Sequence, residues 1–333
     1  MNQMKDKLER ALAHYPARPD SLEIFLRDRD RRLRRRRVGT AAFALGISAL
    51  SVAILIAAMG SLRHGPDTAG NQPVAEGPGM IVFSRWSGGE WKLFAMQPDG
   101  SGEEQITDGS RDFYAEISPD GDRIVADTEL PGTDGLLVAN IDGTDRATFA
   151  VGDAFDPAWS PDGTRIAFAL DSGEAGCCLS LWVMNADGTA LARIGDVRGS
   201  SPTWSPDGTR IAFLLSGEDL EAATRVAIMD ADGSDVRPIS EAAWWGEPSW
   251  SPDGSSILTS RDRGLTDADL LTIGLDGHVQ VIDTLPILGR ADWSPDGTHI
   301  TYVSRGRVWV MAADGSGAHP ITERAEIENP TWG

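Results

Sequence analysis

The chain has 333 residues, of which 41% are hydrophobic and 24% are charged, and its formal net charge is −20 at pH 7. The charge is unevenly placed: residues 1–64 hold 13 Lys and Arg against 6 Asp and Glu, whereas the remaining residues hold 17 against 44. Because contacts to phosphate groups need a basic surface, this acidity excludes nucleic acid as a partner of the larger part. The acidity fits either a well-solvated surface or a preference for cationic partners or calcium.

Residues 1–37 are predicted to form a basic cytoplasmic segment with one short helix. The helix is expected to begin at Asp20, because Glu23 completes a capping-box pair three residues later, and Leu22, Phe25 and Leu26 give a small apolar face. The sequence RDRDRRLRRRR at 27–37 is typical of a topology and lipid-headgroup signal rather than of a binding site.

Residues 38–62, VGTAAFALGISALSVAILIAAMGSL, contain no charged residue and are predicted to form a transmembrane helix. About 20 helical residues cross the ~30 Å hydrocarbon core of a bilayer. A cleaved signal peptide is the alternative, but 37 residues precede the apolar run. Since the arginine run lies on its N-terminal side, the positive-inside rule places the N-terminus in the cytoplasm and the rest of the chain outside. Residues 63–78 are rich in Gly, Pro and small polar residues, which predicts a flexible linker.

The order of these parts, a short amphipathic cytoplasmic piece before a single span, resembles the anti-sigma-factor type of membrane regulator. That resemblance implies a cytoplasmic segment that contacts a transcription factor. The zinc signature His-x-x-x-Cys-x-x-Cys is absent from the sequence.

Residues 79–333 are built from internal repeats. WSPDGTRIAF stands at 159–168 and again at 204–213, and weaker copies of it give Ser-Pro-Asp-Gly runs spaced by 42, 45, 46 and 43 residues. A second marker, an apolar run ending in Asp-Gly, occurs six times, with its glycines at Gly100, Gly143, Gly188, Gly233, Gly277 and Gly315. Self-similarity at this period is typical of repeat architectures, so the six markers indicate six units.

Each unit is predicted to hold four short antiparallel strands. Ser-Pro-Asp-Gly suits a tight hairpin, because Pro presets φ at the second turn position and Gly accepts the left-handed conformation that closes the turn. The Asp-Gly marker predicts a second turn. Six four-stranded units describe an all-β, six-bladed β-propeller. GMIVFSR at 79–85 matches the second strand of a unit and NPTWG at 329–333 the first, so the two segments are expected to share one blade and close the ring.

These repeats resemble those of TolB-like, WD-type propeller proteins, in which a Trp-Ser-Pro-Asp-Gly turn precedes an Ile-Ala-Phe strand and an Asp-Gly turn. The resemblance covers about three quarters of the chain and implies the fold rather than one function. TolB proteins carry an extra α/β domain before the propeller, where this sequence has the predicted span and linker. Roles that depend on that domain are therefore not carried over.

The connections predict where a ligand binds. The Ser-Pro-Asp-Gly and Asp-Gly turns are uniform, whereas the other connections vary and are expected together on the opposite face, over the central channel. The sequence therefore predicts a protein or cell-envelope ligand at this variable-loop face. The candidate binding residues in these loops are Trp244, Trp245, Phe113, Tyr114, Phe155, Asp112, Asp156, Arg198, Glu247, Arg290, Asp292 and Glu328.

Trp244 and Trp245 stand out because neither occupies the repeated tryptophan position of Trp159, Trp204, Trp250, Trp293 and Trp332, which we expect to be packing residues. Adjacent aromatic residues in a loop can anchor a partner or stack on a sugar. The alternative is that one of the pair packs between blades. The same two interpretations apply to the aromatic candidates Phe113, Tyr114 and Phe155, while the charged candidates can ring a channel mouth without any catalytic role.

Cys177 and Cys178 are the only cysteines, and they are adjacent. They can form a vicinal disulfide or remain free or externally paired thiols. They do not make a zinc site on their own. The five histidines lack metal-ligand spacing, and the sequence has neither a Gly-x-Ser-x-Gly elbow nor a phosphate-binding glycine loop. No metal, cofactor or enzymatic activity is therefore predicted.

The sequence thus predicts a single-pass membrane protein whose extracytoplasmic propeller is a binding scaffold or sensor. One alternative is a transmembrane regulator whose cytoplasmic segment contacts a sigma-type transcription factor. The other alternative is a propeller enzyme, a lyase or hydrolase acting on an envelope polysaccharide.

Overall fold

The computed structural model describes residues 79–108, 111–130, 133–171, 179–217, 223–243, 245–263, 267–285, 287–323 and 326–333. These residues belong to one compact unit and contain strands and turns but no helix. The predicted cytoplasmic helix, membrane span and linker lie outside the described residues. Within the described ranges no helix is long and apolar enough to cross a membrane.

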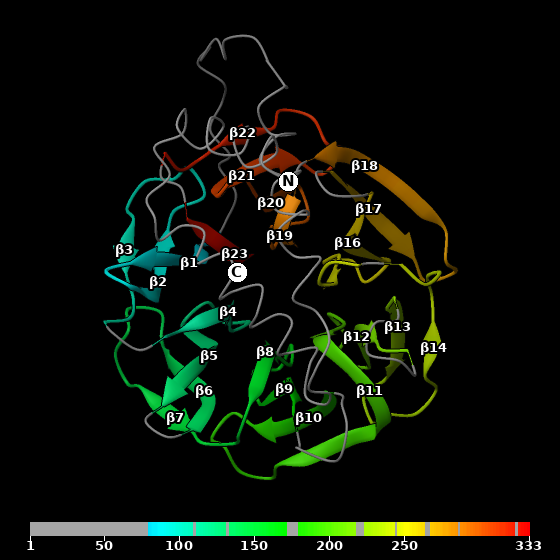
Figure 1. Ribbon diagram of the computed structural model, residues 1–333, viewed down its shortest axis with the longest axis horizontal. Coiled ribbons are helices and arrows are strands. Elements are labelled where there is room, and N and C mark those ends of the chain that lie inside the picture. The colour runs from blue at the N-terminus through cyan, green and yellow to red at the C-terminus, as the bar shows by residue number, and fades with distance from the viewer. Residues whose placement is uncertain are drawn as a thin grey trace, which may run out of the picture. The chain divides into compact units, whose positions relative to one another are not determined.

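The strands form antiparallel sheets that follow one another around a common centre (Figure 1). One four-stranded sheet joins the two ends of the described unit, and its strands in order are β23 (Ile327–Trp332), β1 (Ile81–Ser87), β2 (Glu90–Met96) and β3 (Glu104–Gln105). The next sheet along the chain contains β4 (Phe113–Ile117), β5 (Arg123–Leu130), β6 (Thr133–Asn140) and β7 (Ala147–Phe149).

A seven-stranded sheet follows, made of β8 (Ala154–Trp159), β9 (Arg165–Leu170), β10 (Ser180–Asn185), β11 (Ala192–Trp204), β12 (Arg210–Leu215), β13 (Arg225–Asp230) and β14 (Arg237–Pro238). The long strand β11 joins its two halves, because residues up to Arg198 pair with β10 and residues from Gly199 onward pair with β12.

Two further four-stranded sheets complete the unit. The first contains β15 (Ser249–Trp250), β16 (Ser256–Asp262), β17 (Ala268–Gly274) and β18 (Val279–Leu285). The second contains β19 (Ile287–Trp293), β20 (His299–Ser304), β21 (Arg307–Ala312) and β22 (His319–Pro320). All recorded strand pairs are antiparallel, which is the arrangement that the repeated turns predict.

The innermost strands close a ring. Contacts run from β23 to β4, β4 to β8, β8 to β11, β11 to β15, β15 to β19, and from β19 back to β23. Ile81 of β1 pairs with Trp332 of β23, and the Met80 and Gly333 backbones exchange hydrogen bonds of 2.7 and 3.1 Å. The expected sharing of one sheet by the two ends of the repeat region is thereby confirmed.

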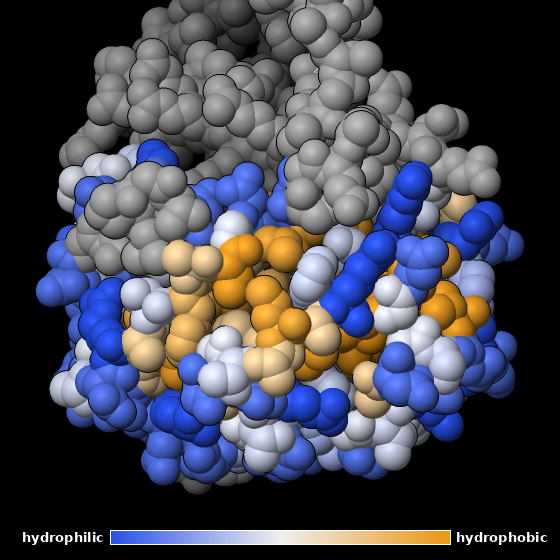
Figure 2. Space-filling model, turned by 90° about the horizontal axis from the view of Figure 1, so that it is seen from below, coloured by the Kyte–Doolittle hydropathy of each residue, from blue (hydrophilic) through white to orange (hydrophobic). Residues whose placement is uncertain are grey.

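The hydrophobic core lies between neighbouring sheets rather than within a single one. One cluster joins Val125 and Leu136, from β5 and β6, to Trp159, Ile166 and Phe168, from β8 and β9. Because each sheet buries one face against the preceding sheet and the other against the following one, its central strands are buried on both sides. On the outer surface seen in Figure 2, hydrophobic side chains form a band that is flanked by hydrophilic ones.

The Ser-Pro-Asp-Gly segments form the predicted hairpins. Between β8 and β9 the Gly163 N–H donates to the Ser160 carbonyl at 2.8 Å, and Gly163 has a φ of 67°. Asp162 Oδ1 accepts hydrogen bonds from the Ser160 hydroxyl at 2.6 Å and from the Thr164 backbone N–H at 3.0 Å. The motif recurs because the aspartate satisfies the polar groups of its own turn.

Candidate binding site at the central channel

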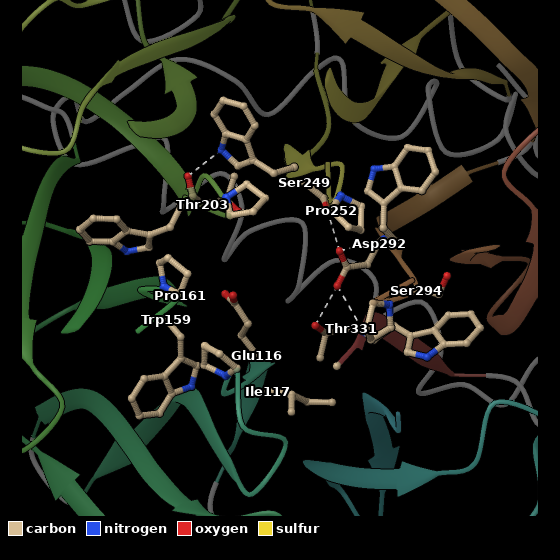
Figure 3. A pocket seen from close by; sticks show the side chains of 18 of the residues that line it. Glu116, Ile117, Trp159, Pro161, Thr203, Ser249, Pro252, Asp292, Ser294 and Thr331 are labelled. Carbon is tan, nitrogen blue, oxygen red and sulfur yellow. Dashed lines mark hydrogen bonds between the residues drawn. The ribbon is translucent and has the colours of Figure 1, made fainter. Parts of the chain in front are cut away.

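The central channel contains a cavity of about 390 Å³ at the end where the innermost strands run into the Ser-Pro-Asp-Gly turns (Figure 3). Repeated positions make up most of its wall. The apolar part consists of Ile117, the five repeated tryptophans and Pro119, Pro161, Pro206, Pro252 and Pro295. The polar part includes Glu116, Thr203, Ser249, Arg290, Asp292 and Thr331.

Most of these polar side chains share one position of the repeat. Successive side chains of a strand point to opposite faces, so the residue before each repeated tryptophan points away from the tryptophan's side of the sheet. At this position the cavity is lined by Glu116, which precedes Ile117 in place of a tryptophan, and by Thr203, Ser249, Asp292 and Thr331.

A β-bulge recurs two residues further toward the start of the innermost strands. The register shifts at this place in β4, β8, β11 and β23, where Tyr114, Asp156, Ser201 and Asn329 have φ values of 50–53°. A bulge inserts an extra residue and turns its side chain. Asp156 and Ser201 meet across two neighbouring strands in this way, with Ser201 Oγ donating to Asp156 Oδ2 at 3.0 Å.

Asp292 connects three innermost strands. Its Oδ1 accepts a hydrogen bond from Ser249 Oγ of β15 at 2.6 Å, and its Oδ2 accepts bonds from Thr331 Oγ1 at 2.9 Å and from the Trp332 N–H of β23 at 3.1 Å. Because both carboxylate oxygens are held from neighbouring strands, Asp292 is a preorganised part of the channel wall.

Glu116 has a different environment. Its side chain extends into the cavity (Figure 3), and its buried Oε2 has no hydrogen-bond partner among the described residues. Burial raises the pKa of Glu116 to about 8, and the charge of Asp292 adds to this shift, whereas the Arg290 charge and a hydrogen bond from the Trp159 backbone oppose it. Of the carboxyl groups that line the cavity, Glu116 therefore has the least stabilisation of its ionised form by hydrogen bonds and positive charge.

Arg290 is the cationic group of this cavity wall. Its side chain is 12% exposed, and its Nη2 lies 3.9 Å from Asp292 Oδ2. Burial lowers the pKa of Arg290, but the charges of Asp292, Glu116, Glu247 and Asp156 outweigh burial and raise it above its usual value. Four carboxyl groups thus act on one guanidinium group.

The structure brings four of the sequence-predicted residues together in this way. Arg290 and Asp292 line the cavity, and the charges of Asp156, at the bulge of β8, and of Glu247, two residues before β15, act on Arg290. Glu328 is half-buried beside the bulge of β23, whereas Arg198 is exposed where β11 changes its pairing partner. Glu116 was not among the predicted residues, although its place before Ile117 matched the position of Asp292 before Trp293.

Phe113 and Tyr114 are buried in an aromatic cluster. The ring of Phe113 lies 4.9 Å from Trp91 and 4.6 Å from Tyr114, both edge to face. Phe155 is half-buried and packs against the core of the seven-stranded sheet. These aromatic residues thus pack within the unit.

Asp112 is buried and fixes the start of β4. Thr128 Oγ1 donates to its Oδ1 at 2.7 Å, and Arg146 Nη2 lies 3.4 Å from its Oδ2. Burial raises the pKa of Asp112, which outweighs the opposing hydrogen bonds and the Arg146 charge. Its contacts reach β5 and the segment that leads into β7, so this carboxyl group ties one sheet together.

Trp245 is 9% exposed and packs in a core cluster with Leu214, Ile228 and Trp250. Its indole N–H donates to the Glu241 carbonyl at 3.0 Å, and the Arg261 guanidinium lies 5.8 Å from its ring centre. Trp245 therefore has the environment of a packing residue. Trp244, Cys177 and Cys178 lie outside the described residues, so the predicted aromatic pair and the vicinal disulfide are not described.

Across the described ranges, no group of three or more His, Cys, Asp or Glu side chains is placed to hold a metal ion. The carboxyl groups of the channel are distributed over separate strands, and Asp292 is already engaged by hydroxyl groups.

A closed ring of antiparallel sheets around a channel defines a β-propeller. The sequence profile of the TolB beta propeller domain (PD40) matches residues 150–333, which is more than half of the chain. The chain belongs to the TolB β-propeller domain family, which confirms the TolB-like resemblance of its repeats.

The sequence of the chain aligns with curated relatives over part of their length. The chain is 34% identical over 99 residues to the Tol-Pal system protein TolB of Anaeromyxobacter dehalogenans strain 2CP-C, an alignment that covers 28% of this chain and 23% of the relative. A second relative, from Anaeromyxobacter sp. strain K, is 35% identical over 106 residues with the same coverage. The chain thus spans about a quarter of the length of these relatives.

Solved structures share the fold. TolB from Acinetobacter baumannii superposes with a TM-score of 0.65 at 16% identity, covering 76% of this chain and 66% of that one. An oligogalacturonate lyase in complex with manganese gives a TM-score of 0.50 at 16% identity, covering 72% and 73%. At these identities the likeness concerns the fold alone.

Proposed function

We propose that the chain is a membrane-anchored, extracytoplasmic binding protein whose six-bladed propeller takes a protein or cell-envelope ligand at its central channel. To give six blades, the seven-stranded sheet is divided at β11, and the two halves of this strand belong to two successive blades. Membership of the TolB β-propeller domain family supports a scaffold role, since relatives with this propeller are named Tol-Pal system proteins.

The observation that carries the proposal is the cavity at the turn end of the channel. A concave site with an apolar wall and a few convergent polar groups is the usual form of a binding site. Here the wall is built from tryptophans and prolines, while Glu116, Arg290 and Asp292 supply the polar groups. As a second part of the proposal, residues at the variable-loop end, such as Arg198 and Glu328, also contact the ligand.

The proposed anchoring is supported by the sequence. Residues 38–62 are uncharged, and the arginine-rich run precedes them. This arrangement favours a cytoplasmic N-terminus and an extracytoplasmic propeller. We propose binding rather than catalysis, because the likeness to a lyase concerns the fold alone.

Site-specific photo-crosslinking of the full chain in native membranes tests this function. A photoreactive residue is placed at Pro206 or Pro295, which line the cavity and are exposed, at Arg198 of the variable-loop end, or at Val281 of the outer strand β18, which is 47% exposed. We expect one defined protein or envelope adduct from Pro206 and Pro295 and none from Val281. An adduct from Arg198 would extend the site to the variable-loop end. Equal adducts at all four positions, or none, would refute channel binding.

A further inference from the structure

We propose that the channel cavity receives a primary ammonium group on an apolar stem, as in a lysine side chain of the bound protein. The inference deepens the proposed function and rests on it, because it names the chemical group that enters the channel. It is carried by the charge of the cavity, by the Oε2 atom of Glu116, which has no hydrogen-bond partner among the described residues, and by the apolar lining.

The charge of the cavity calls for a further cation. Arg290 is acted on by the carboxyl groups of Glu116, Asp156, Glu247 and Asp292, so one guanidinium faces four acids. Carboxylates in a partly buried site are stable only when paired with a positive charge or with hydrogen-bond donors. A ligand with one positive charge reduces this imbalance, whereas an anionic ligand would increase it.

The hydrogen-bonding groups of the cavity wall indicate that the ligand carries a hydrogen-bond donor. Asp292 is satisfied by Ser249, Thr331 and Trp332, but the buried Oε2 of Glu116 has no partner in the part of the chain that the structure describes. The two groups approach the cavity from different sides (Figure 3). An ammonium group has three N–H donors and no acceptor, so it can donate to Glu116 and still reach a hydroxyl group of the wall.

The entrance favours an apolar stem. Exposed prolines of the turns, such as Pro206 and Pro295, line the cavity together with buried polar groups such as Asp292 and Thr331. Lysine buries its four methylene groups along apolar surfaces while its charged end reaches polar partners. A cavity of about 390 Å³ accommodates one such side chain.

Two other cations fit less well. Since the described side chains include no set of three metal-ligating groups, a metal ion would find too few protein ligands. A guanidinium group is planar and needs a fork of acceptors, but Asp292, which could supply one, is already hydrogen-bonded. A compact ammonium group needs one carboxylate oxygen that is open to a donor, which Oε2 of Glu116 supplies when this group is ionised.

Titration with capped amino acids tests the inference on the full chain in detergent micelles. The probe is Nα-acetyl-lysine methylamide, and the readout is tryptophan fluorescence, because five tryptophans line the cavity. We expect saturation at on the order of 1–10 mM. Capped norleucine, which has the stem without the charge, and capped arginine should each bind at least about tenfold more weakly.

Variants assign the binding to Glu116. Glu116→Gln should weaken capped-lysine binding at least about tenfold, whereas Glu104→Gln, which changes an exposed residue of β3, should leave it unchanged. Wild-type binding should strengthen from pH 6 to pH 9, because Glu116 has a pKa of about 8 and the ligand amine stays charged. Glu116→Gln should lose this pH dependence.

Three results would overturn the inference: no saturation with capped lysine, equal binding of capped norleucine or arginine, or an unchanged affinity and pH profile in Glu116→Gln. The proposed function fails in a different way. If Pro206 and Pro295 give no specific adduct, channel binding of a protein is wrong whatever capped lysine does. If they give an adduct that persists in Glu116→Gln, the function stands and the ammonium inference is wrong.

Discussion

Single aspartates hold the repeated turns in place. Asp207 Oδ1 accepts hydrogen bonds from Ser205 Oγ at 2.6 Å, from the Thr209 N–H at 3.0 Å and from Thr209 Oγ1 at 2.8 Å. These bonds lower the pKa of Asp207 to about 2, with the Ser205 bond contributing most. The corresponding Asp162 has the same partners and the same direction of shift.

Asp207→Ala should therefore lower the free energy of unfolding by about 1–2 kcal/mol near pH 7. The folded-state pKa is depressed, so this stabilisation is present above about pH 4 and is lost as the pH falls toward 2. Chemical denaturation at several pH values measures the difference. Asp207→Asn, which keeps one acceptor oxygen, should lose less. A cost no larger than that of Glu323→Gln, at an exposed site, would contradict this role.

Glu116 should give stability the opposite pH dependence. Its folded-state pKa, about 8, lies above the ordinary value of 4.5, so the folded protein keeps a proton that the unfolded chain releases. The contribution of Glu116 to stability is fully present below about pH 4.5 and is lost as the pH rises through 8.

We therefore expect Glu116→Gln to be more stable than the wild type at pH 9, by on the order of 2–4 kcal/mol, with the difference shrinking toward pH 5. Urea denaturation of both proteins across this range measures it. Parallel pH curves for the wild type and Glu116→Gln would show that Glu116 is ionised throughout, as an exposed glutamate is.

At the scale of strands, neighbouring sheets are joined by cation–π stacking. Arg165, the first residue of β9, places its guanidinium 4.5 Å from the ring centre of Trp204 in β11, and Arg123 of β5 lies 4.8 Å from Trp159 of β8. The arginine after one hairpin thus covers the tryptophan before the next. This gives the Arg-Ile-Ala-Phe part of the repeat a role between sheets.

Arg165→Ala should destabilise the protein by about 0.5–1 kcal/mol through loss of this stacking. Arg210 holds the same place in the repeat, but it makes no such ring contact with Trp250 within the described residues, so Arg210→Ala serves as the matched control. Thermal or urea unfolding monitored by tryptophan fluorescence compares the two. An equal loss in both variants would show that the contribution is not specific to the stacked pair.

The strands and turns were the parts most accessible to sequence reasoning. Ser-Pro-Asp-Gly, which occurs five times, and the Asp-Gly marker, which occurs six times, define turns through local conformational preferences, so the antiparallel pairing follows from them. The recurring bulge does not follow from these turn motifs. Only the observed pairing of β8 with β9 shows that the register shifts at Asp156. The bulge also determines which side chains face the channel.

The cavity was harder to predict for the same reason. The sequence predicts Asp292 and Arg290 as loop residues of the variable face, whereas they line a cavity at the turn end of the innermost strands. The sequence pattern does not single out Glu116, because its unit has Ile117 in place of the repeated tryptophan. Aligning the residue that precedes this position in each unit was the signal that could have found it.

At the scale of the whole described unit, closure of the ring depends on β23. This strand pairs with β1 and supplies Thr331 and Trp332 to the carboxylate of Asp292. Deleting residues 326–333 should therefore leave β1 as an open edge and remove two donors from a buried acid. We expect aggregation and loss of the near-UV circular dichroism signal.

A rearranged chain provides the control for this deletion. Placing residues 326–333 before Gly79, joined by a short glycine-rich linker, restores β23 beside β1, because Met80 and Gly333 are already hydrogen-bonded. This variant should fold as a monomer. A truncated chain that stays monomeric with an unchanged spectrum would show that closure does not depend on β23.

The central claim is that a partner enters the channel at the turn end. Photo-crosslinking from Pro206 in native membranes, in the presence of capped lysine or capped norleucine, tests it most directly. We predict a specific adduct that capped lysine suppresses in a concentration-dependent way and capped norleucine does not. An adduct that forms equally with both compounds, or that arises from Val281 as readily as from Pro206, would contradict the account.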